Sequence, residues 1–223
     1  LELYGLAAYK IASADFTNHE LLAEIVKTNT PVICSTGMCS EAEIQASTNL
    51  LKDLGAQCIL LHCNSTYPTP FKDVNLAYLS KLRAFGFDVG YSGHERGISV
   101  PVAAVSLGAR IIEKHFTLDQ SLPGPDQSMS MEPPAFKEMV SRIRDVEQSL
   151  GDGNKIPTSE EKTNIAISRQ RIIAAKNIKK NAVLRLEDLT TSRSANGIFA
   201  DKFWDVIGSV ATSDFEVGEA IER

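Results

Sequence analysis

The chain has 223 residues, of which 43% are hydrophobic and 23% are charged, and its formal net charge is −5 at pH 7. This composition is typical of a folded globular protein, and the length suffices for one large α/β domain with or without a second, small one. Because the basic residues are scattered along an acidic chain, the sequence predicts neither a nucleic acid nor an anionic membrane as a partner.

The four cysteines are expected to be free thiols. Cys34, Cys39, Cys58 and Cys63 lack CxxC spacing and the density of a disulfide scaffold. No apolar run approaches the roughly 18 residues that span a bilayer, and residues 1–10 lack the charged and apolar regions of a signal peptide. We therefore expect a cytoplasmic protein.

Residues 8–150 alternate between short apolar runs and helical patterns. The expected strands are 8–13, 31–36, 57–63, 87–92 and 109–116, and the helices expected after them are 18–28, 40–55, 73–86, 98–108 and 134–151. Strand followed by helix, five times in succession, is typical of parallel βα units. Asn18 is the expected cap of the first helix, and Ser40 with Glu43 is an expected capping box for the second.

The chain changes character after residue 150. Residues 151–168 are polar, contain Gly and Pro and show no sustained period, so we interpret them as a linker. From residue 169 onward, short β-like runs and a turn at Lys180 and Asn181 predict a small, mostly β module over 169–223. A module of this size holds little core on its own.

The expected fold of residues 1–150 is an incomplete TIM-type barrel. Five βα units are too few to close an eight-stranded barrel, and the first strand is not followed by the Gly-rich phosphate turn of a Rossmann sheet. We therefore expect a barrel that lacks its first strands. A complete open sheet of five strands is the alternative.

In a parallel α/β domain the functional groups gather at the carboxyl ends of the strands. The side chains expected there, strand by strand, are Lys10, Ser13 and Asp15; Ser35, Thr36 and Gly37; His62, Asn64, Ser65 and Tyr67; Ser92 and His94; Glu113 and His115. Glu113 and His115 are two residues apart and therefore point to one face of their strand.

Two imidazoles at neighbouring strand ends suggest a metal site. His94 and His115, with oxygen donors and water, suit a divalent cation such as Mn²⁺, Fe²⁺ or Zn²⁺. Lys10 and the nearby hydroxyls are suited to hold a phosphate. The simpler alternative is that Glu113 pairs with a neighbouring cation at the surface and that His115 is a core residue with a satisfied hydrogen bond; the convergence of two His and one Glu on strand ends favours the site.

Three further features have either a structural or a functional interpretation. We interpret His62, inside an apolar run, as structural, and His19, at a helix start, as having no catalytic role. After Phe116 a long loop carries Asp126 behind the stiff segment 123–125. Such a loop is either functional or a solvent-facing turn whose Asp caps its own backbone.

The strings YKIAS, STGM, LHC with YPTP, GYSGHE, EKHFTLD and PGPD follow one another in an order and spacing that resembles the sialic acid synthases. These enzymes condense phosphoenolpyruvate with N-acetylmannosamine or a related N-acyl sugar and release phosphate. The tail is similar to the family's antifreeze-like (SAF-type) domain. The resemblance implies a (β/α)₈ barrel whose first strands precede residue 1, with a partial barrel over 1–150, a linker over 151–168 and the antifreeze-like domain over 169–223.

The resemblance also implies roles for particular residues. His94 and His115 would bind the metal, with Mn²⁺ expected and Mg²⁺ or Co²⁺ as alternatives. The catalytic acidic residues would be Glu113, Asp126 and Asp15, and the substrate-binding residues would be Lys10, Ser13, Ser65, Tyr67, Ser92 and Arg193. Arg193 would reach the barrel of the other subunit in a domain-swapped homodimer.

Two alternative functions remain at this point. One is a non-catalytic sugar-binding protein built on a truncated barrel. The other is a metal-dependent hydrolase, for which the sequence shows no carboxylate-bridged pattern of a two-metal site.

Overall fold

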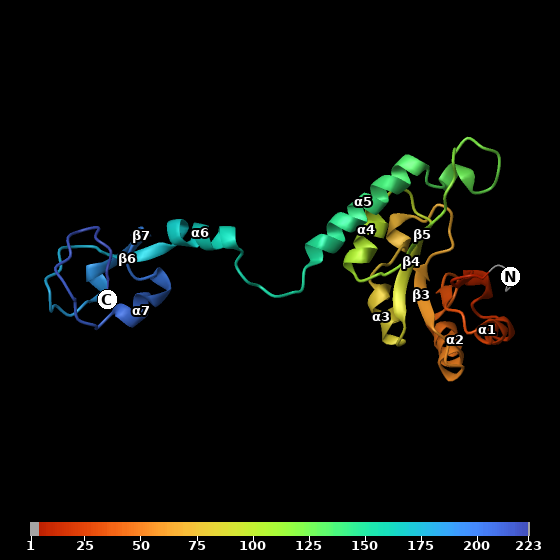
Figure 1. The fold of residues 1–223 in the computed structure, drawn as a ribbon, viewed down its shortest axis with the longest axis horizontal. Helices are drawn as coiled ribbons and strands as arrows, with labels where there is room; N and C mark the ends of the chain where they lie inside the picture. Colours follow the sequence, from red (N-terminus) through yellow and green to blue (C-terminus); the bar gives the residue numbers. More distant parts are fainter. Residues whose placement is uncertain (1–4, 223) are drawn as a thin grey trace. The chain divides into compact units, whose positions relative to one another are not determined.

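The computed structural model describes residues 5–222, and the chain divides after Gly153 into two compact units (Figure 1). Among the described residues, no helix is long and apolar enough to cross a membrane. Each unit has a hydrophobic core of its own, so each is described by itself.

The first unit is built on a parallel sheet with the strand order β1-β2-β3-β4-β5. Its strands are β1 (Tyr9–Ile11), β2 (Val32–Ser35), β3 (Cys58–Cys63), β4 (Asp88–Gly93) and β5 (Ile112–Lys114). The helices that follow them are α1 (His19–Val26), α2 (Glu41–Asp53), α3 (Tyr78–Ala84), α4 (Ser99–Ser106) and α5 (Pro133–Leu150). Short 3₁₀ helices occupy Ser13–Asp15, Phe71–Asp73 and Gln127–Met129. The five predicted βα units are confirmed, and consecutive strands are neighbours, as in the wall of a barrel.

One face of this sheet packs against the helices. Alternate strand residues such as Val32, Cys34 and Leu60 share a core with Leu22 of α1 and Leu51 of α2. Because successive strand residues point to opposite faces, the residues between them face away from the helices.

The strand register arranges those other residues in rows. Cys63 pairs with Ser92, and Ser92 pairs with Glu113, so the three lie side by side across β3, β4 and β5. This row is on the face opposite the helix-packed Tyr91. The polar row therefore belongs to the face that lines the inside of a barrel wall.

The predicted helix caps are confirmed. The side chain of Asn18 accepts a hydrogen bond from the backbone N–H of Leu21. Ser40 and Glu43 form both halves of a capping box at the start of α2. These short-range contacts fix where the helices begin, and with them the loops that carry the strand-end residues.

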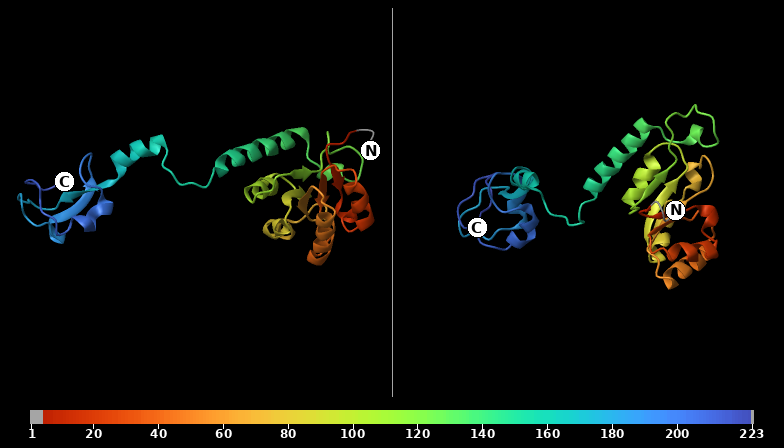
Figure 2. Two further views of the ribbon diagram at one scale, coloured as in Figure 1. Left: turned by 60° about the horizontal axis from the view of Figure 1, so that its bottom comes forward. Right: turned by 45° about the vertical axis from the view of Figure 1, so that its right-hand side comes forward.

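The second unit pairs two antiparallel strands, β6 (Gln170–Ala174) and β7 (Leu189–Arg193) (Figure 2). The other elements are the helices α6 (Ser159–Ser168) and α7 (Phe203–Val206) and the 3₁₀ helices Leu186–Asp188 and Ala200–Lys202. The buried core includes Ile172, Leu184 and Phe215. The predicted turn is present, with Asn181 at φ 68°.

The segment 151–168 is not free of regular structure. Helix α6 fills its second half and begins with a capping box formed by Thr158 and Glu161. The sequence pattern missed this helix because α6 has no buried residue and therefore no apolar period.

Candidate active site

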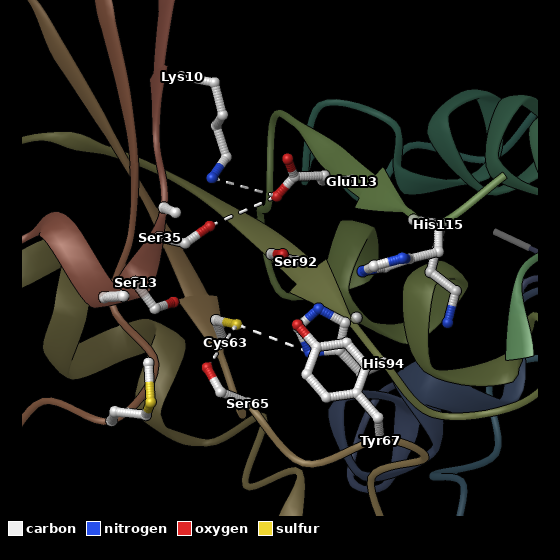
Figure 3. A pocket seen from close by; sticks show the side chains of 15 residues that line it. Lys10, Ser13, Ser35, Cys63, Ser65, Tyr67, Ser92, His94, Glu113 and His115 are labelled. Atoms are coloured by element: carbon white, nitrogen blue, oxygen red, sulfur yellow. Dashed lines mark hydrogen bonds and ion pairs between the residues drawn. The ribbon is translucent and has the colours of Figure 1, made fainter. Parts of the chain in front are cut away.

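A cavity of about 580 Å³ opens at the carboxyl ends of the strands. Each strand contributes a polar side chain to its lining: Lys10 from β1, Ser35 from β2, Cys63 from β3, Ser92 from β4 and Glu113 from β5 (Figure 3). The volume is typical of a small-molecule site. All five strands thus present a polar side chain to the same cavity.

Glu113 is held in this cavity by residues from two other strands. Its Oε2 lies 3.5 Å from Lys10 Nζ and accepts a hydrogen bond of 3.4 Å from Ser35 Oγ (Figure 3). Both Lys10 and Glu113 are about one-third exposed, with side-chain exposures of 34% and 39%. The carboxylate and ammonium therefore face the cavity together and remain accessible to a ligand.

The alternative pairing of Glu113 at the surface is not what the structure shows. Arg110 pairs with Asp88, at 3.2 Å, and Lys114 pairs with Glu95, at 3.0 Å. Glu113 is accordingly left to face the cavity.

The two predicted metal-binding histidines lie together. Their ring centroids are 5.2 Å apart, and the ring of Tyr67 packs 4.0 Å from that of His94 (Figure 3). The Nδ1 of His94 donates to the backbone oxygen of Asn64 over 2.6 Å. This bond orients the ring and leaves the Nε2 lone pair for another partner, as a metal ligand requires.

The donor types at this place are those that suit one divalent cation with open positions. His115 Nδ1 lies 3.7 Å from Asp126 Oδ2, so a carboxylate stands beside the second imidazole. Among residues 5–222 no group of three or more His, Cys, Asp or Glu side chains is arranged to hold a metal. A cation shared by His94 and His115 would therefore take its other ligands from water and substrate.

The thiol of Cys63 adds a charge-sensitive group to the cavity. Burial raises the pKa of Cys63, but hydrogen bonds with His94 and Ser13 outweigh this effect and leave the pKa below its usual value. For His94, burial lowers the pKa, and the contacts with Cys63 and the Asn64 carbonyl outweigh it, leaving the pKa raised. The two groups thus stabilise each other's charged forms, and a cation that binds His94 Nε2 would have to displace its proton.

Gly37 makes room for two hydroxyls that line the cavity. Its backbone N–H donates to Ser13 Oγ over 3.0 Å. A Cβ atom at this position would lie 2.3 Å from Ser65 Oγ and 2.8 Å from Ser13 Oγ. Only a residue without a side chain lets both hydroxyls converge here.

Most predicted site residues line the main cavity: Lys10, Ser13, Ser65, Tyr67, Ser92, His94, Glu113 and His115. Asp126 lines a small adjoining pocket with Tyr67 and both histidines. Asp15 is exposed in the 3₁₀ helix Ser13–Asp15 and is not among the residues lining either pocket. Arg193 is exposed at the end of β7 in the second unit, and its action on a partner subunit stays a prediction.

The two remaining histidines have local partners. His62 is buried, and its Nε2 lies 2.7 Å from the Val74 backbone oxygen. His19 Nε2 lies 3.2 Å from Ser47 Oγ. Both placements agree with a structural role.

Three residues of this region carried no individual prediction: Ser35, Cys63 and Glu95. Ser35 stood among the strand-end residues, and the alternation along β2 and β3 could have placed both side chains on the inward face. Glu95 is 1% exposed and pairs with Lys114, the residue before His115. Nothing in the sequence pattern marks a charged residue in a loop as buried.

Comparison with known proteins identifies relatives for both units. Residues 1–155 match the NeuB family, and residues 169–222 match the SAF domain. The N,N'-diacetyllegionaminic acid synthase of Campylobacter jejuni is 43% identical over 98% of this chain and 67% of its own length. The synthase of the same name from Legionella pneumophila is 38% identical over 97% of this chain and 63% of its own length. The chain thus spans about two thirds of these relatives.

Two solved structures have folds similar to that of this chain. The crystal structure of N-acetylneuraminic acid synthetase from Leptospira borgpetersenii in complex with citrate superimposes with a TM-score of 0.69 at 37% identity. That match covers 74% of this chain and 58% of the other. A putative spore coat polysaccharide biosynthesis protein E from Chromobacterium violaceum, 24% identical, covers 99% of this chain and 68% of its own with a TM-score of 0.78, and supports the fold.

Proposed function

The chain belongs to the NeuB family and carries a SAF domain, and on that premise we propose that the protein is a nonulosonate synthase. Its reaction would condense phosphoenolpyruvate with an N-acyl sugar aldehyde and release inorganic phosphate. The proposal is supported mainly by one observation: a lysine, a glutamate, several hydroxyls and two adjacent imidazoles line one cavity.

Phosphoenolpyruvate is the substrate to which the β1 side of the cavity is suited. The ammonium of Lys10 would bind a phosphate or carboxylate oxygen by a charge-assisted hydrogen bond. The hydroxyls of Ser13, Ser35 and Ser92 line the same cavity and would donate to the remaining oxygens. Together these groups would fix the enol carbon toward the histidines.

The sugar would occupy the histidine side of the cavity. A divalent cation held by His94 and His115, with Mn²⁺ as our first choice, would act as a Lewis acid on the aldehyde oxygen. Tyr67 is 46% exposed beside both rings, and Asp126 faces them from the loop. These two side chains would contact the sugar hydroxyls.

The bond changes balance without any further reactant than water. C3 of phosphoenolpyruvate forms the new bond to the aldehyde carbon, whose oxygen gains a proton. Positive charge then develops at C2, and the Glu113 carboxylate, which faces the cavity, would stabilise it. Water adds at C2 and releases one proton, which balances the proton gained by the aldehyde oxygen. Phosphate then leaves with the second proton by cleavage of the C–O bond, as the C2 hydroxyl becomes a carbonyl.

The names of the relatives favour an acceptor with two acetamido groups. The two diacetyllegionaminic acid synthases are 43% and 38% identical to this chain, compared with 35% for the human N-acetylneuraminate-9-phosphate synthase. We therefore place a diacetamido sugar before N-acetylmannosamine as the substrate to test.

Phosphate release from phosphoenolpyruvate by the purified protein tests the proposal. We expect release only when both Mn²⁺ and an N-acyl sugar are present, with one nonulosonic acid formed per phosphate. Chelation by EDTA should stop the reaction, and added Mn²⁺ should restore it. Sugar binding without phosphate release would instead support a non-catalytic sugar-binding protein.

A further inference from the structure

A buried ion pair joins the residue that follows His94 to the residue that precedes His115. Lys114 Nζ lies 3.0 Å from Glu95 Oε1 and donates to the Glu95 backbone oxygen over 2.5 Å. The side chains are 3% and 0% exposed. The other carboxylate oxygen of Glu95 accepts a hydrogen bond of 2.6 Å from the hydroxyl of Tyr91, which is itself 2% exposed.

Two residues of this network are chain neighbours of the two histidines. Glu95 directly follows His94, and Lys114 directly precedes His115. The last paired residues of β4 and β5 are Gly93 and Lys114. The contact from Lys114 to Glu95 therefore joins the two strands just beyond their last backbone pair. His94 and His115 also follow that last pair directly.

The backbone is shaped to accept this carboxylate. A Cβ atom on Gly93 would lie 2.7 Å from Glu95 Oε2 and 2.6 Å from a ring carbon of Tyr91. Residue 93 therefore has to be glycine for the Glu95 side chain to fold back under the strand.

Stability alone does not explain a buried ion pair at this place. Desolvation of two charges offsets much of their attraction, and well-packed hydrophobic residues of similar volume often serve folding equally well. The pair also fixes the orientation of Glu95, because two donor bonds from one ammonium hold both its side chain and its backbone.

We propose that Tyr91, Glu95 and Lys114 form a clamp that sets the distance and orientation of the two imidazoles, so that they share one divalent cation. We assign them a positioning role, exerted through His94 and His115, although Lys114 also lines the cavity beside both histidines. The clamp rests on the proposed function, because the cation belongs to that proposal.

The test replaces the clamp by apolar residues and measures the site with and without metal. The double variant Glu95→Leu/Lys114→Met keeps the interior filled, and Mn²⁺ affinity is measured by electron paramagnetic resonance of the free ion. We expect binding at least about tenfold weaker than in the wild type, the loss typical when groups that orient metal ligands are removed. In the metal-free protein, the ¹⁵N ring signals of His94 and His115 should shift.

The matched control lies at the other end of the same two strands. Asp88 and Arg110 also join β4 to β5 by an ion pair, but both are exposed. Asp88→Asn should leave Mn²⁺ affinity and the histidine ring signals at their wild-type values. Equal effects of Asp88→Asn and the double variant would overturn the clamp, since any link between the strands would then serve.

Other outcomes separate the clamp from the proposed function. Unchanged affinity and ring signals in a folded double variant would overturn the clamp. A wild-type protein that binds no Mn²⁺ would overturn the metal assignment, and the ring signals of the metal-free variants would still decide the clamp. If the double variant does not fold, Tyr91→Phe removes a single hydroxyl and should produce a smaller shift of the same signals; no shift would count against the clamp.

Discussion

The two ends of the parallel sheet carry the same kind of ion pair in opposite surroundings. At the amino ends of β4 and β5, Asp88 and Arg110 pair at 3.2 Å with side-chain exposures of 53% and 72%. At the carboxyl ends, Glu95 and Lys114 pair at 3.0 Å with exposures of 0% and 3%. The two pairs have similar distances but differ in their exposure to solvent.

The difference shows that only one end of this sheet holds its charged side chains firmly in place. An exposed pair contributes about 0–1 kcal/mol, whereas removing one partner of a buried pair costs about 3–5 kcal/mol because a charge is left without a counterpart. The carboxyl ends therefore hold their side chains in fixed places, and these are the ends where parallel α/β proteins place their active sites.

The largest expected effect is that of His94→Ala, which removes one of the two imidazoles at the carboxyl ends. Loss of a proposed metal ligand should lower kcat/KM at least about 1,000-fold, since Lewis-acid stabilisation of a transition state amounts to several kcal/mol. Phosphate release at saturating Mn²⁺ measures it. His19→Ala, an exposed helix-start position, is the control and should match the wild type. Full turnover by His94→Ala would show that the metal assignment is wrong.

Lys10→Met should come next. The variant removes the ammonium that faces the cavity, and charge-assisted hydrogen bonds to a phosphate or carboxylate contribute roughly 1.5–3 kcal/mol. We expect the KM for phosphoenolpyruvate to rise about 10–100-fold. Lys81→Met, an exposed position of α3, serves as the control. A KM equal to that of the wild type would exclude Lys10 from substrate binding.

Gly37→Ala should have a moderate effect. The added methyl group would meet the hydroxyls of Ser13 and Ser65, and overpacking of this kind costs about 1–3 kcal/mol. Thermal unfolding should show that loss, and the KM for phosphoenolpyruvate should rise as Ser13 is displaced. Adding Ser65→Ala removes the closer contact and should recover stability. If Gly37→Ala leaves both quantities unchanged, the hydroxyls of Ser13 and Ser65 do not lie against Gly37 as described.

The smallest effect is expected at the amino ends. Arg110→Ala breaks the exposed pair with Asp88 and should change the free energy of unfolding by no more than about 1 kcal/mol. Denaturant unfolding measures this, and kcat/KM should be the same as in the wild type. A tenfold loss of activity would contradict the separation of the two ends.

The fold of the first unit followed from local patterns. Alternating strands and helices, the Asn18 cap and the capping box at Ser40 are short-range features, so the sequence predicted them and the structure confirms them. Helix α6 was missed because it lacks an apolar stripe. Its capping box was the one local feature that pointed to it.

The site was predictable only in part. Strand ends could be found from the pattern, and with them Lys10, Ser92, His94, Glu113 and His115, which the structure brings to one cavity. The burial of Glu95 and Lys114 depends on how β4 and β5 align, which is a contact between segments far apart in the chain. A periodicity argument does not contain that information, and for this reason the clamp was found only in the structure.

The most direct test is a crystal structure of the protein grown with Mn²⁺ and phosphoenolpyruvate, with diffraction recorded on both sides of the manganese absorption edge. We predict a single anomalous peak within coordinating distance of the ring nitrogens of His94 and His115, with the phosphate of the ligand beside Lys10. Imidazoles turned away from each other, or a peak at another place, would contradict the site described here.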